Sequence, residues 1–529
     1  MTDLNGPEII LVLMLLVAIF SLLAEKIQWS APIVMTLAGL GLTLIPGLPV
    51  ITLDPHLVFL FILPPLLYVA GSRTSWRDFR FHLRSITLLA TGLVVATTMA
   101  IAWAAMQLIP GLTWPVAILL GAIIAPPDAV AATALAEKLK LPKRIVTILE
   151  GESLMNDATS LVIYKIAIAV ILSGSFTWAQ AVGDFALMAI GGIGIGLVMG
   201  YVMAKLRKPI DNPSIEITLS LLTPFAAYLA AEELGLSGIL SVVACGLYIG
   251  WHLPRITSSG SRMVGYTVWN VVNFILNNIV FLLIGLQLPS IFPVVEQYGW
   301  QELAIYSAGI IAIMLLVRMA WVFPGAYLPH LFSRRIHKRE TLPPPNWVAF
   351  VGWAGMRGVV SLAAALALPL TMADGTAFPY RDLIVFLTFV VIIFTLIAPG
   401  LSLAWVAKTL RIPREEHNHH EERLAREHSL TTALAQLAAH EQSGSHHQTV
   451  IDALSSNLKL RLEELGVEDV TDNELSACVG NFQNLHKKII GVQRQAILDL
   501  RQQHRIGDEV MRQLIRELDF EELRLEKVA

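Results

Sequence analysis

Four carboxylates lie in two neighbouring apolar stretches of the chain, where ionisable side chains are rare. Asp128 lies in one stretch, and Glu150, Glu152 and Asp157 lie in the next. Because a buried charge in a lipid-facing segment is unfavourable by a few kcal/mol, such residues face a cavity, a partner or an ion path. A structural ion-pair network is the alternative for any one of them, but four carboxylates together favour ion handling.

The second stretch places three oxygen-bearing side chains on one helix face. Ser153, Asn156 and Asp157 have the spacing i, i+3, i+4, which predicts that they are neighbours on a helix. Hydroxyl, amide and carboxylate oxygens suit an alkali cation rather than a soft metal. A carboxylate that binds either Na⁺ or H⁺ couples the two by competition. With Asp157 as the single exchange group, the stoichiometry is 1:1, and only the ion gradients drive transport, at about 1.4 kcal/mol per pH unit.

Two apolar segments contain sequences that break a helix. Pro126 and Pro127 remove backbone donors directly before Asp128. A later segment has a matching weak point, Gly352-Trp-Ala-Gly-Met-Arg-Gly358. Broken helices at corresponding positions of two halves indicate an ion site near the bilayer midplane.

The segments that position these residues predict a polytopic membrane protein. The 529 residues are 55% hydrophobic and only 15% charged, with a mean hydropathy of +0.63. Since about 20 apolar residues span a bilayer, the sequence predicts an all-α fold with thirteen transmembrane segments: 7–26, 30–48, 55–71, 84–108, 115–137, 144–172, 179–204, 214–232, 236–252, 264–288, 302–329, 347–372 and 382–408. The two broken segments are seven apart, as two inverted repeats of six helices around a seventh require.

The loop charges predict an orientation. Lys and Arg residues gather in alternate loops, and the other loops hold only Arg381. By the positive-inside rule, the N-terminus lies outside and the C-terminus in the cytoplasm. The first apolar run has no basic residues before it and no cleavage site, so we expect a retained helix rather than a signal peptide.

The charge distribution divides the chain into two predicted domains. Residues 1–411 form the transmembrane domain. Residues 412–529 hold nearly half of the charged residues and most of the histidines, and their helical period predicts a cytoplasmic regulatory or interaction tail. The sequence contains no Walker-type loop, no zinc-type Cys/His spacing and no nucleophile–base pair in the spans. We therefore expect neither an ATP-driven pump nor an enzyme, with no cofactor beyond the transported ions and no nucleic-acid partner.

The motifs resemble a known family. Pro127-Asp128-Ala-Val, followed in the next segment by Glu152-Ser-x-x-Asn-Asp157, resembles the electroneutral sodium/proton exchanger branch of the monovalent cation:proton antiporters. The resemblance spans about residues 10–410 and includes matches at Phe61-Ile-Leu-Pro-Pro-Leu-Leu, Glu232-Glu-Leu-Gly-Leu-Ser-Gly, Phe281-Leu-Leu-Ile-Gly-Leu and Gly355-Met-Arg-Gly. The sequence from Ile506 resembles bacterial members with a long C-terminal tail.

The resemblance implies roles for the oxygen-bearing residues. Asp157 is expected to bind the ion and the proton, and Asp128 is the nearby acid in the broken helix, so that both carboxylates contact Na⁺. Ser153 contributes an oxygen, and Asn156 adds polarity without a second titratable charge.

The resemblance also implies partners for the other buried charges. Glu152 is expected to form a structural ion pair with Arg318 in the eleventh segment. Arg357 is expected to compensate helix-end or carboxylate charge near the second break. Lys165 lies two turns past Asp157, and we expect it to extend towards an interface rather than to pair with Asp157.

Two departures from the family pattern leave the preferred cation open. Val69 occupies a position in the third segment where many relatives carry an acid, and Pro127 occurs where relatives often have Thr. Either change alters the oxygens around the ion, so Na⁺, Li⁺ and K⁺ all stay candidates.

The expected function is secondary antiport of Na⁺, or of Li⁺ or K⁺, for H⁺ by alternating access. Resemblance implies a homodimer in a bacterial inner membrane that serves cytoplasmic pH and sodium homeostasis. The alternatives are a K⁺-preferring antiporter, a cation channel with the same buried acids, and a sensor whose transmembrane body anchors the tail.

Overall fold

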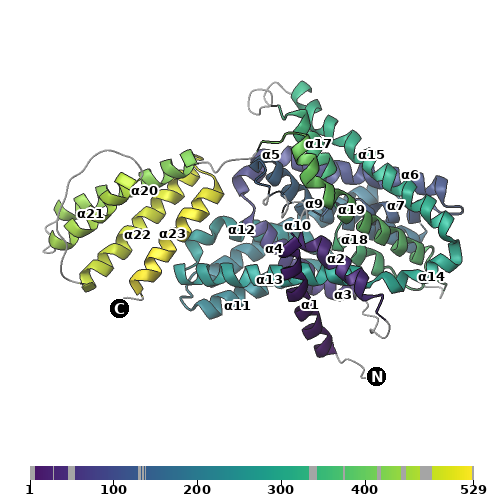
Figure 1. Ribbon diagram of the computed structural model, residues 1–529, viewed down its shortest axis with the longest axis horizontal. Helices are drawn as coiled ribbons and strands as arrows, with labels where there is room; N and C mark the ends of the chain where they lie inside the picture. Colours follow the sequence, from purple (N-terminus) through teal and green to yellow (C-terminus); the bar gives the residue numbers. More distant parts are fainter. Residues whose placement is uncertain are drawn as a thin grey trace.

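The chain folds into helices, which form a large body and a smaller group beside it (Figure 1). The computed structural model describes residues 6–27, 29–45, 54–128, 133, 136, 139–174, 176–332, 342–372, 376–413, 419–442, 448–464 and 479–526. Within these ranges, β-pairing is confined to one isolated bridge between Thr371 and Ala377. The all-helical prediction is confirmed.

One set of helices packs chiefly within itself and carries both predicted breaks; we call it the site bundle. It consists of α5 (Trp76–Thr87), the π-helical η2 (Leu88–Leu93), α6 (Val94–Leu108), α7 (Trp114–Ile124), α9 (Lys143–Ser173), α15 (Trp300–Phe332), α17 (Pro345–Trp353), α18 (Val359–Leu366) and α19 (Arg381–Thr409).

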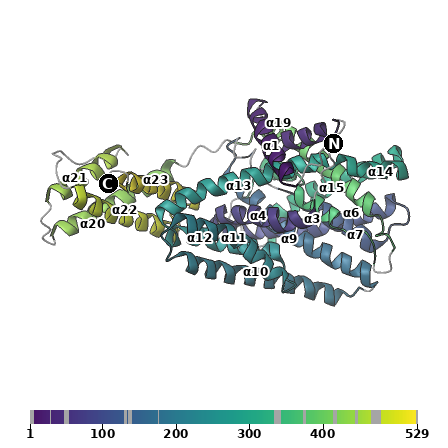
Figure 2. The ribbon, with the colours of Figure 1, turned by 90° about the horizontal axis from the view of Figure 1, so that it is seen from below.

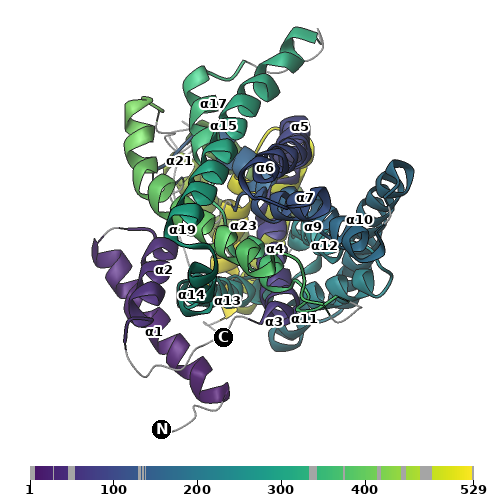
Figure 3. The ribbon, with the colours of Figure 1, turned by 90° about the vertical axis from the view of Figure 1, so that its right-hand side faces the viewer.

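A second set, the companion bundle, packs beside it. It consists of α1 (Gly6–Ile27), α2 (Ala31–Leu42), α3 (Pro55–Leu57), the π-helical η1 (Val58–Ile62), α4 (Leu63–Arg73), α10 (Trp178–Arg207), α11 (Pro213–Glu232), α12 (Gly238–Ile256) and α13 (Ser259–Leu286). Figure 3 shows α1 and α10 on opposite sides of the molecule. Glycine permits the close helix crossings here: a Cβ on Gly250 of α12 would lie 2.2 Å from the Ser72 carbonyl oxygen of α4.

The described residues include nine helices long and apolar enough to cross a membrane. They coincide with predicted segments three, four, six to eleven and thirteen. The 22-residue α1 lies at the first predicted segment, and shorter helices lie at segments two, five and twelve. The helix at the fourth predicted segment starts at Trp76, before the predicted start at residue 84, and runs to Leu108. A further helix, α14 (Leu288–Tyr298), lies between segments ten and eleven, where the sequence analysis predicted none.

Four C-terminal helices form the smaller group, which we call the tail: α20 (His419–Gln442), α21 (Gln448–Glu464), α22 (Val479–Gln502) and α23 (Asp508–Glu526). Its apolar residues recur every three or four positions and form two buried clusters, one of them around Ile497, Val510 and Leu514. Figures 1 and 2 show the tail beside the ends of α12 and α13.

Candidate functional site

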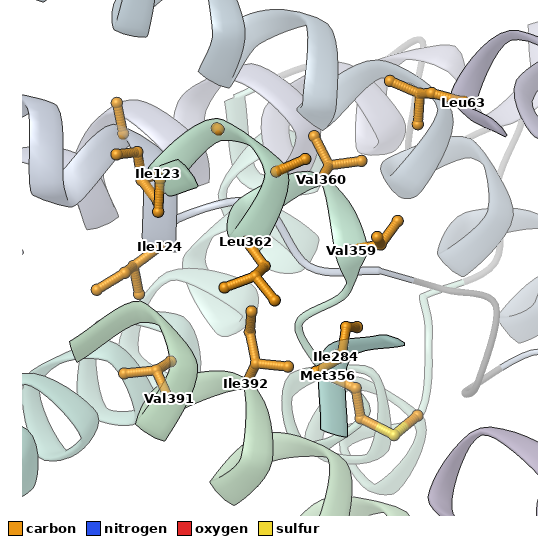
Figure 4. Packing of buried hydrophobic residues seen from close by; sticks show 14 of the residues in the cluster. Leu63, Ile123, Ile124, Ile284, Met356, Val359, Val360, Leu362, Val391 and Ile392 are labelled. Atoms are coloured by element: carbon orange, nitrogen blue, oxygen red, sulfur yellow. The ribbon is translucent and has the colours of Figure 1, made fainter. Parts of the chain in front are cut away.

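The two helix breaks meet inside the site bundle. Helix α7 ends at Ile124, before the tandem prolines, and the second break separates α17 from α18. The Asp128 backbone N–H donates a hydrogen bond to the Met356 carbonyl oxygen at 2.6 Å. Figure 4 shows the apolar residues around this crossing, with Ile123 and Ile124 of α7 near Leu362 of α18 and Val391 and Ile392 of α19. The extended segments are thus held together by backbone pairing and enclosed by a packed apolar shell.

Arg357 satisfies the carbonyl groups that the first break leaves without helical partners. Its Nε donates to the Ile124 carbonyl oxygen and its Nη2 to that of Ala125, each at 3.1 Å. Its Nη1 donates to the Gly355 carbonyl oxygen at 2.6 Å. The side chain is only 1% exposed. Unsatisfied carbonyls are strongly unfavourable in a bilayer, so one arginine stabilises both breaks.

The Asp128 carboxylate lies directly against the second break. A Cβ built on Gly358 would be 1.8 Å from Asp128 Oδ2, closer than two non-bonded atoms can approach. Only glycine therefore leaves room for Asp128 in this position.

Replacement of Gly358 by alanine should lower the initial rate of cation-dependent proton movement by about tenfold or more, since a displacement of about 1 Å at a binding centre has effects of this size. The rate is measured in proteoliposomes with an internal pH dye. Gly194→Ala in α10 is the matched control, because a Cβ there meets nothing within 4 Å. Equal rates in the two variants would show that Asp128 does not need its present position.

Helix α9 brings its polar face to the first break. Asn156 Nδ2 donates to the Pro127 carbonyl oxygen at 2.5 Å, and Ser160 Oγ donates to that of Ala122 at 2.5 Å. The Asn156 side chain is fully buried, and within the described part of the chain its Oδ1 has no hydrogen-bond donor. A buried amide oxygen that can still accept a hydrogen bond can also serve as a ligand for a dehydrated cation.

Asp157 and Asp128 come together at this crossing. Asp157 is 7% exposed, and its carboxylate lies close enough to that of Asp128 for the two charges to interact. Ser153 is half-buried one turn earlier on α9. Two carboxylates beside an amide oxygen can hold a monovalent cation or, in its place, a proton.

Glu152 contacts Arg318 of α15. Arg318 Nη1 donates to Glu152 Oε1 at 2.6 Å and Nη2 donates to Oε2 at 3.1 Å, with both side chains 2% exposed. Arg318 also donates to the carbonyl oxygens of Val351 and Gly352 near the end of α17. The pair therefore joins α9, α15 and α17, three helices of the site bundle.

The remaining predicted charges lie elsewhere. Lys165 Nζ is 2.9 Å from Glu232 Oε2 of α11, so it forms an ion pair rather than only extending towards an interface. Glu150 is half-buried near the start of α9. Val69 is buried in the apolar core.

Several contributors to the site were not predicted. Thr395 Oγ1 accepts a hydrogen bond from the Arg357 backbone N–H at 3.1 Å. The carbonyl oxygens of Pro127 and Met356 hold the crossing together. The tandem prolines and the paired glycines showed where helices lose backbone hydrogen bonds. The sequence of α19 did not indicate that Thr395 would accept a hydrogen bond from the distant Arg357 backbone.

Comparisons with known proteins identify the family of the chain. The sequence model of the family "Sodium/hydrogen exchanger, transmembrane" matches residues 10–409. An uncharacterized Na⁺/H⁺ exchanger of Mycobacterium tuberculosis is 35% identical over 98% of this chain and 96% of that protein. A sodium, potassium, lithium and rubidium/H⁺ antiporter of Bacillus pumilus is 36% identical over 74% of this chain and 60% of that protein.

A solved structure shows the same fold. The sodium proton antiporter MjNhaP1 from Methanocaldococcus jannaschii at pH 8 superposes with a TM-score of 0.58 at 20% identity, covering 76% of this chain and 97% of that one. Since the family model covers most of the chain and the full-length relatives exceed 30% identity, the chain belongs to the sodium/hydrogen exchanger family, a family of multi-pass membrane antiporters and not of enzymes.

Proposed function

We propose that this protein exchanges Na⁺ for H⁺ at Asp157 by alternating access, with an electroneutral 1:1 stoichiometry. Asp157 binds the cation or the proton, and Asp128, Asn156 and Ser153 supply further oxygens. The Glu152–Arg318 pair braces the site bundle, and Arg357 compensates the broken helix ends.

The observation that carries this proposal is the crossing itself. Two non-helical segments from distant parts of the chain meet where Asp157 lies, and the buried Asn156 Oδ1 has no donor within the described residues. Such an arrangement offers oxygen ligands to a dehydrated cation, as paired broken helices do in transporters. A single titrating carboxylate then binds one species at a time, so the cation and the proton compete for the same site.

We further propose the architecture that this mechanism needs. Thirteen transmembrane helices form two inverted repeats of six, with the N-terminus outside and residues 412–529 in the cytoplasm of a bacterial cell. The protein acts as a homodimer in the plasma membrane for pH and sodium homeostasis. Because the Bacillus pumilus relative is named for four alkali cations, Li⁺ and K⁺ are proposed as further substrates.

An uphill transport experiment distinguishes exchange from a channel. In proteoliposomes with an acidic interior and equal Na⁺ on both sides, the protein should accumulate Na⁺ until the two gradients balance at about 1.4 kcal/mol per pH unit. An imposed membrane potential should leave the initial rate unchanged. Na⁺ flux that never exceeds equilibrium would indicate a channel, and a rate that depends on potential would exclude the 1:1 stoichiometry.

Competition between ions at one carboxylate predicts a pH dependence. As the pH falls, the apparent KM for Na⁺ should rise by up to about tenfold per pH unit while the maximal rate at saturating Na⁺ stays constant. The measurement is initial rates over a series of Na⁺ concentrations and pH values, repeated with Li⁺ and K⁺. A maximal rate that falls with an unchanged KM would indicate separate sites for the proton and the cation.

A further inference from the structure

A cavity of about 80 Å³ lies in the companion bundle, lined by residues of α4, α10, α11, α12 and α13. Helix α23 lies beside α13 (Figure 1) and covers the cavity from the tail side. Since about 10–15 Å³ suffices for one water molecule, the cavity has room for several waters or for one small polyatomic ion. The described residues that line it do not include Asp157, Asp128, Asn156 or Ser153, so it is separate from the candidate ion site.

The lining of this cavity is basic. It contains five arginines and two carboxylates: Arg73, Arg207, Arg262, Arg512 and Arg516, with Glu216 and Asp519. Arg262 is neutralised by Asp519, because its Nη2 donates to Oδ1 at 2.5 Å and its Nε donates to Oδ2 at 3.0 Å. Arg73 and Arg516 are exposed, so the basic lining reaches the surface of the protein. The remaining positive charge favours an anion in the cavity.

One ion pair at the cavity is incomplete. Arg207 Nη2 donates to Glu216 Oε1 at 3.3 Å, and the two side chains are only 5% and 1% exposed. In the part of the chain that the structure describes, Arg207 Nε, Arg207 Nη1 and Glu216 Oε2 have no hydrogen-bond partner. Buried charged groups with unpaired atoms are unfavourable, so these three atoms indicate a ligand that satisfies them.

The types of the unpaired atoms select the ligand. The two nitrogens belong to one guanidinium, whose planar fork matches two oxygens of a phosphate or a sulfate. Glu216 Oε2 is an acceptor and needs a ligand that also donates a proton. Inorganic phosphate keeps a P–OH group near neutral pH, and a phosphate monoester, with a second pKa of about 6, retains one beside a carboxylate. Sulfate and phosphodiesters carry no such group.

We propose that this cavity binds a protonated phosphate group, from inorganic phosphate or from the monoester headgroup of phosphatidic acid. Arg207 donates to two phosphate oxygens through Nε and Nη1, and the P–OH donates to Glu216 Oε2. Tyr68 and Ser220 add hydroxyl groups to the lining. The bound group completes the buried ion pair where α10 and α11 meet.

Equilibrium binding of radiolabelled phosphate to the full-length protein in detergent tests the site. We expect one phosphate per chain. Sulfate at the same ionic strength should compete at least about tenfold less well, because it leaves Glu216 Oε2 unpaired. Phosphate should also raise the thermal unfolding midpoint progressively with its concentration. Absence of binding, or equal competition by sulfate, would overturn the proposal.

Two substitutions separate a ligand site from a structural ion pair. Arg207→Gln should weaken phosphate binding by about tenfold or more, because it removes the charge of the guanidinium fork. Glu216→Gln should instead abolish the preference for phosphate over sulfate, since an amide can donate to either anion. A merely structural pair would leave that preference unchanged in Glu216→Gln, which would overturn the proposal. Arg426→Gln is the control, because its partners Glu422 and Glu517 lie outside the cavity, and it should bind phosphate normally.

Vesicles of defined composition identify the source of the phosphate group. The protein is reconstituted in phosphatidylcholine alone, with phosphatidic acid, or with phosphatidylglycerol. Loss of phosphate binding with phosphatidic acid alone would assign the site to the lipid monoester, and equal binding in all three would assign it to inorganic phosphate. Equal loss with phosphatidylglycerol, a phosphodiester, would overturn the need for a P–OH group. Asp157→Asn should bind phosphate normally, so this proposal and the proposed exchange can fail separately.

Discussion

Replacement of Asp157 by Asn should reduce cation-dependent proton movement to the level of protein-free liposomes. The change keeps the size of the side chain but removes its charge and its proton, so the site can no longer alternate between cation and proton. The loss should be complete because Asp157 is only 7% exposed, so bulk water cannot take over the role of the carboxylate in binding the cation or the proton. The measurement is the dye-reported pH change on addition of Na⁺ to proteoliposomes.

A matched control separates this effect from a general loss of acidity. Asp211→Asn makes the same chemical change at an exposed carboxylate between α10 and α11 and should exchange at the original rate. The Asp157→Asn protein should also keep its thermal unfolding midpoint or exceed it, because it removes a buried charge close to Asp128. Unchanged exchange in the Asp157→Asn protein would refute the assignment of Asp157 as the carboxylate that binds the cation and the proton.

Replacement of Glu152 by Gln should lower the free energy of unfolding by about 3–5 kcal/mol, because it leaves the buried Arg318 without a counter-charge. Both side chains are only 2% exposed, so water cannot compensate. Thermal unfolding in detergent, followed by the loss of monodisperse protein, measures the change. Exchange at low temperature should persist in the fraction that stays folded, because the Glu152 carboxylate is bound to Arg318 and is not one of the proposed ion ligands.

The half-exposed pair between Lys165 and Glu232 provides the control for this prediction. Its side chains are 40% and 32% exposed, and Glu232→Gln should change the free energy of unfolding by less than about 1 kcal/mol. Replacing both buried partners, as in Glu152→Leu with Arg318→Met, should recover part of the loss. The free energy of unfolding recovers only in part, because Arg318 also donates hydrogen bonds to the carbonyl oxygens of Val351 and Gly352. Equal effects of Glu152→Gln and Glu232→Gln would show that burial does not set the strength of these pairs.

The sequence by itself determined the class of the protein and the places where its helices break. Apolar runs of membrane length predict helices in any bilayer protein, since the backbone must satisfy its own hydrogen bonds there. Tandem prolines before Asp128 and paired glycines around Arg357 stop a helix through local sterics alone. The Asn156-Asp157 motif likewise identified the family, because these residue types and their order are readable without a structure.

Only the tertiary structure decided which groups meet. Local sterics freed the carbonyls of Ile124 and Ala125, but packing brought Arg357 to them from more than 230 positions away along the chain. Packing likewise paired Lys165 with Glu232 and placed the tail across both bundles. Such contacts depend on the positions of whole helices in space, and a buried charge takes whichever opposite charge those positions bring near. The sequence therefore showed which groups need a partner, and the fold selected the partner.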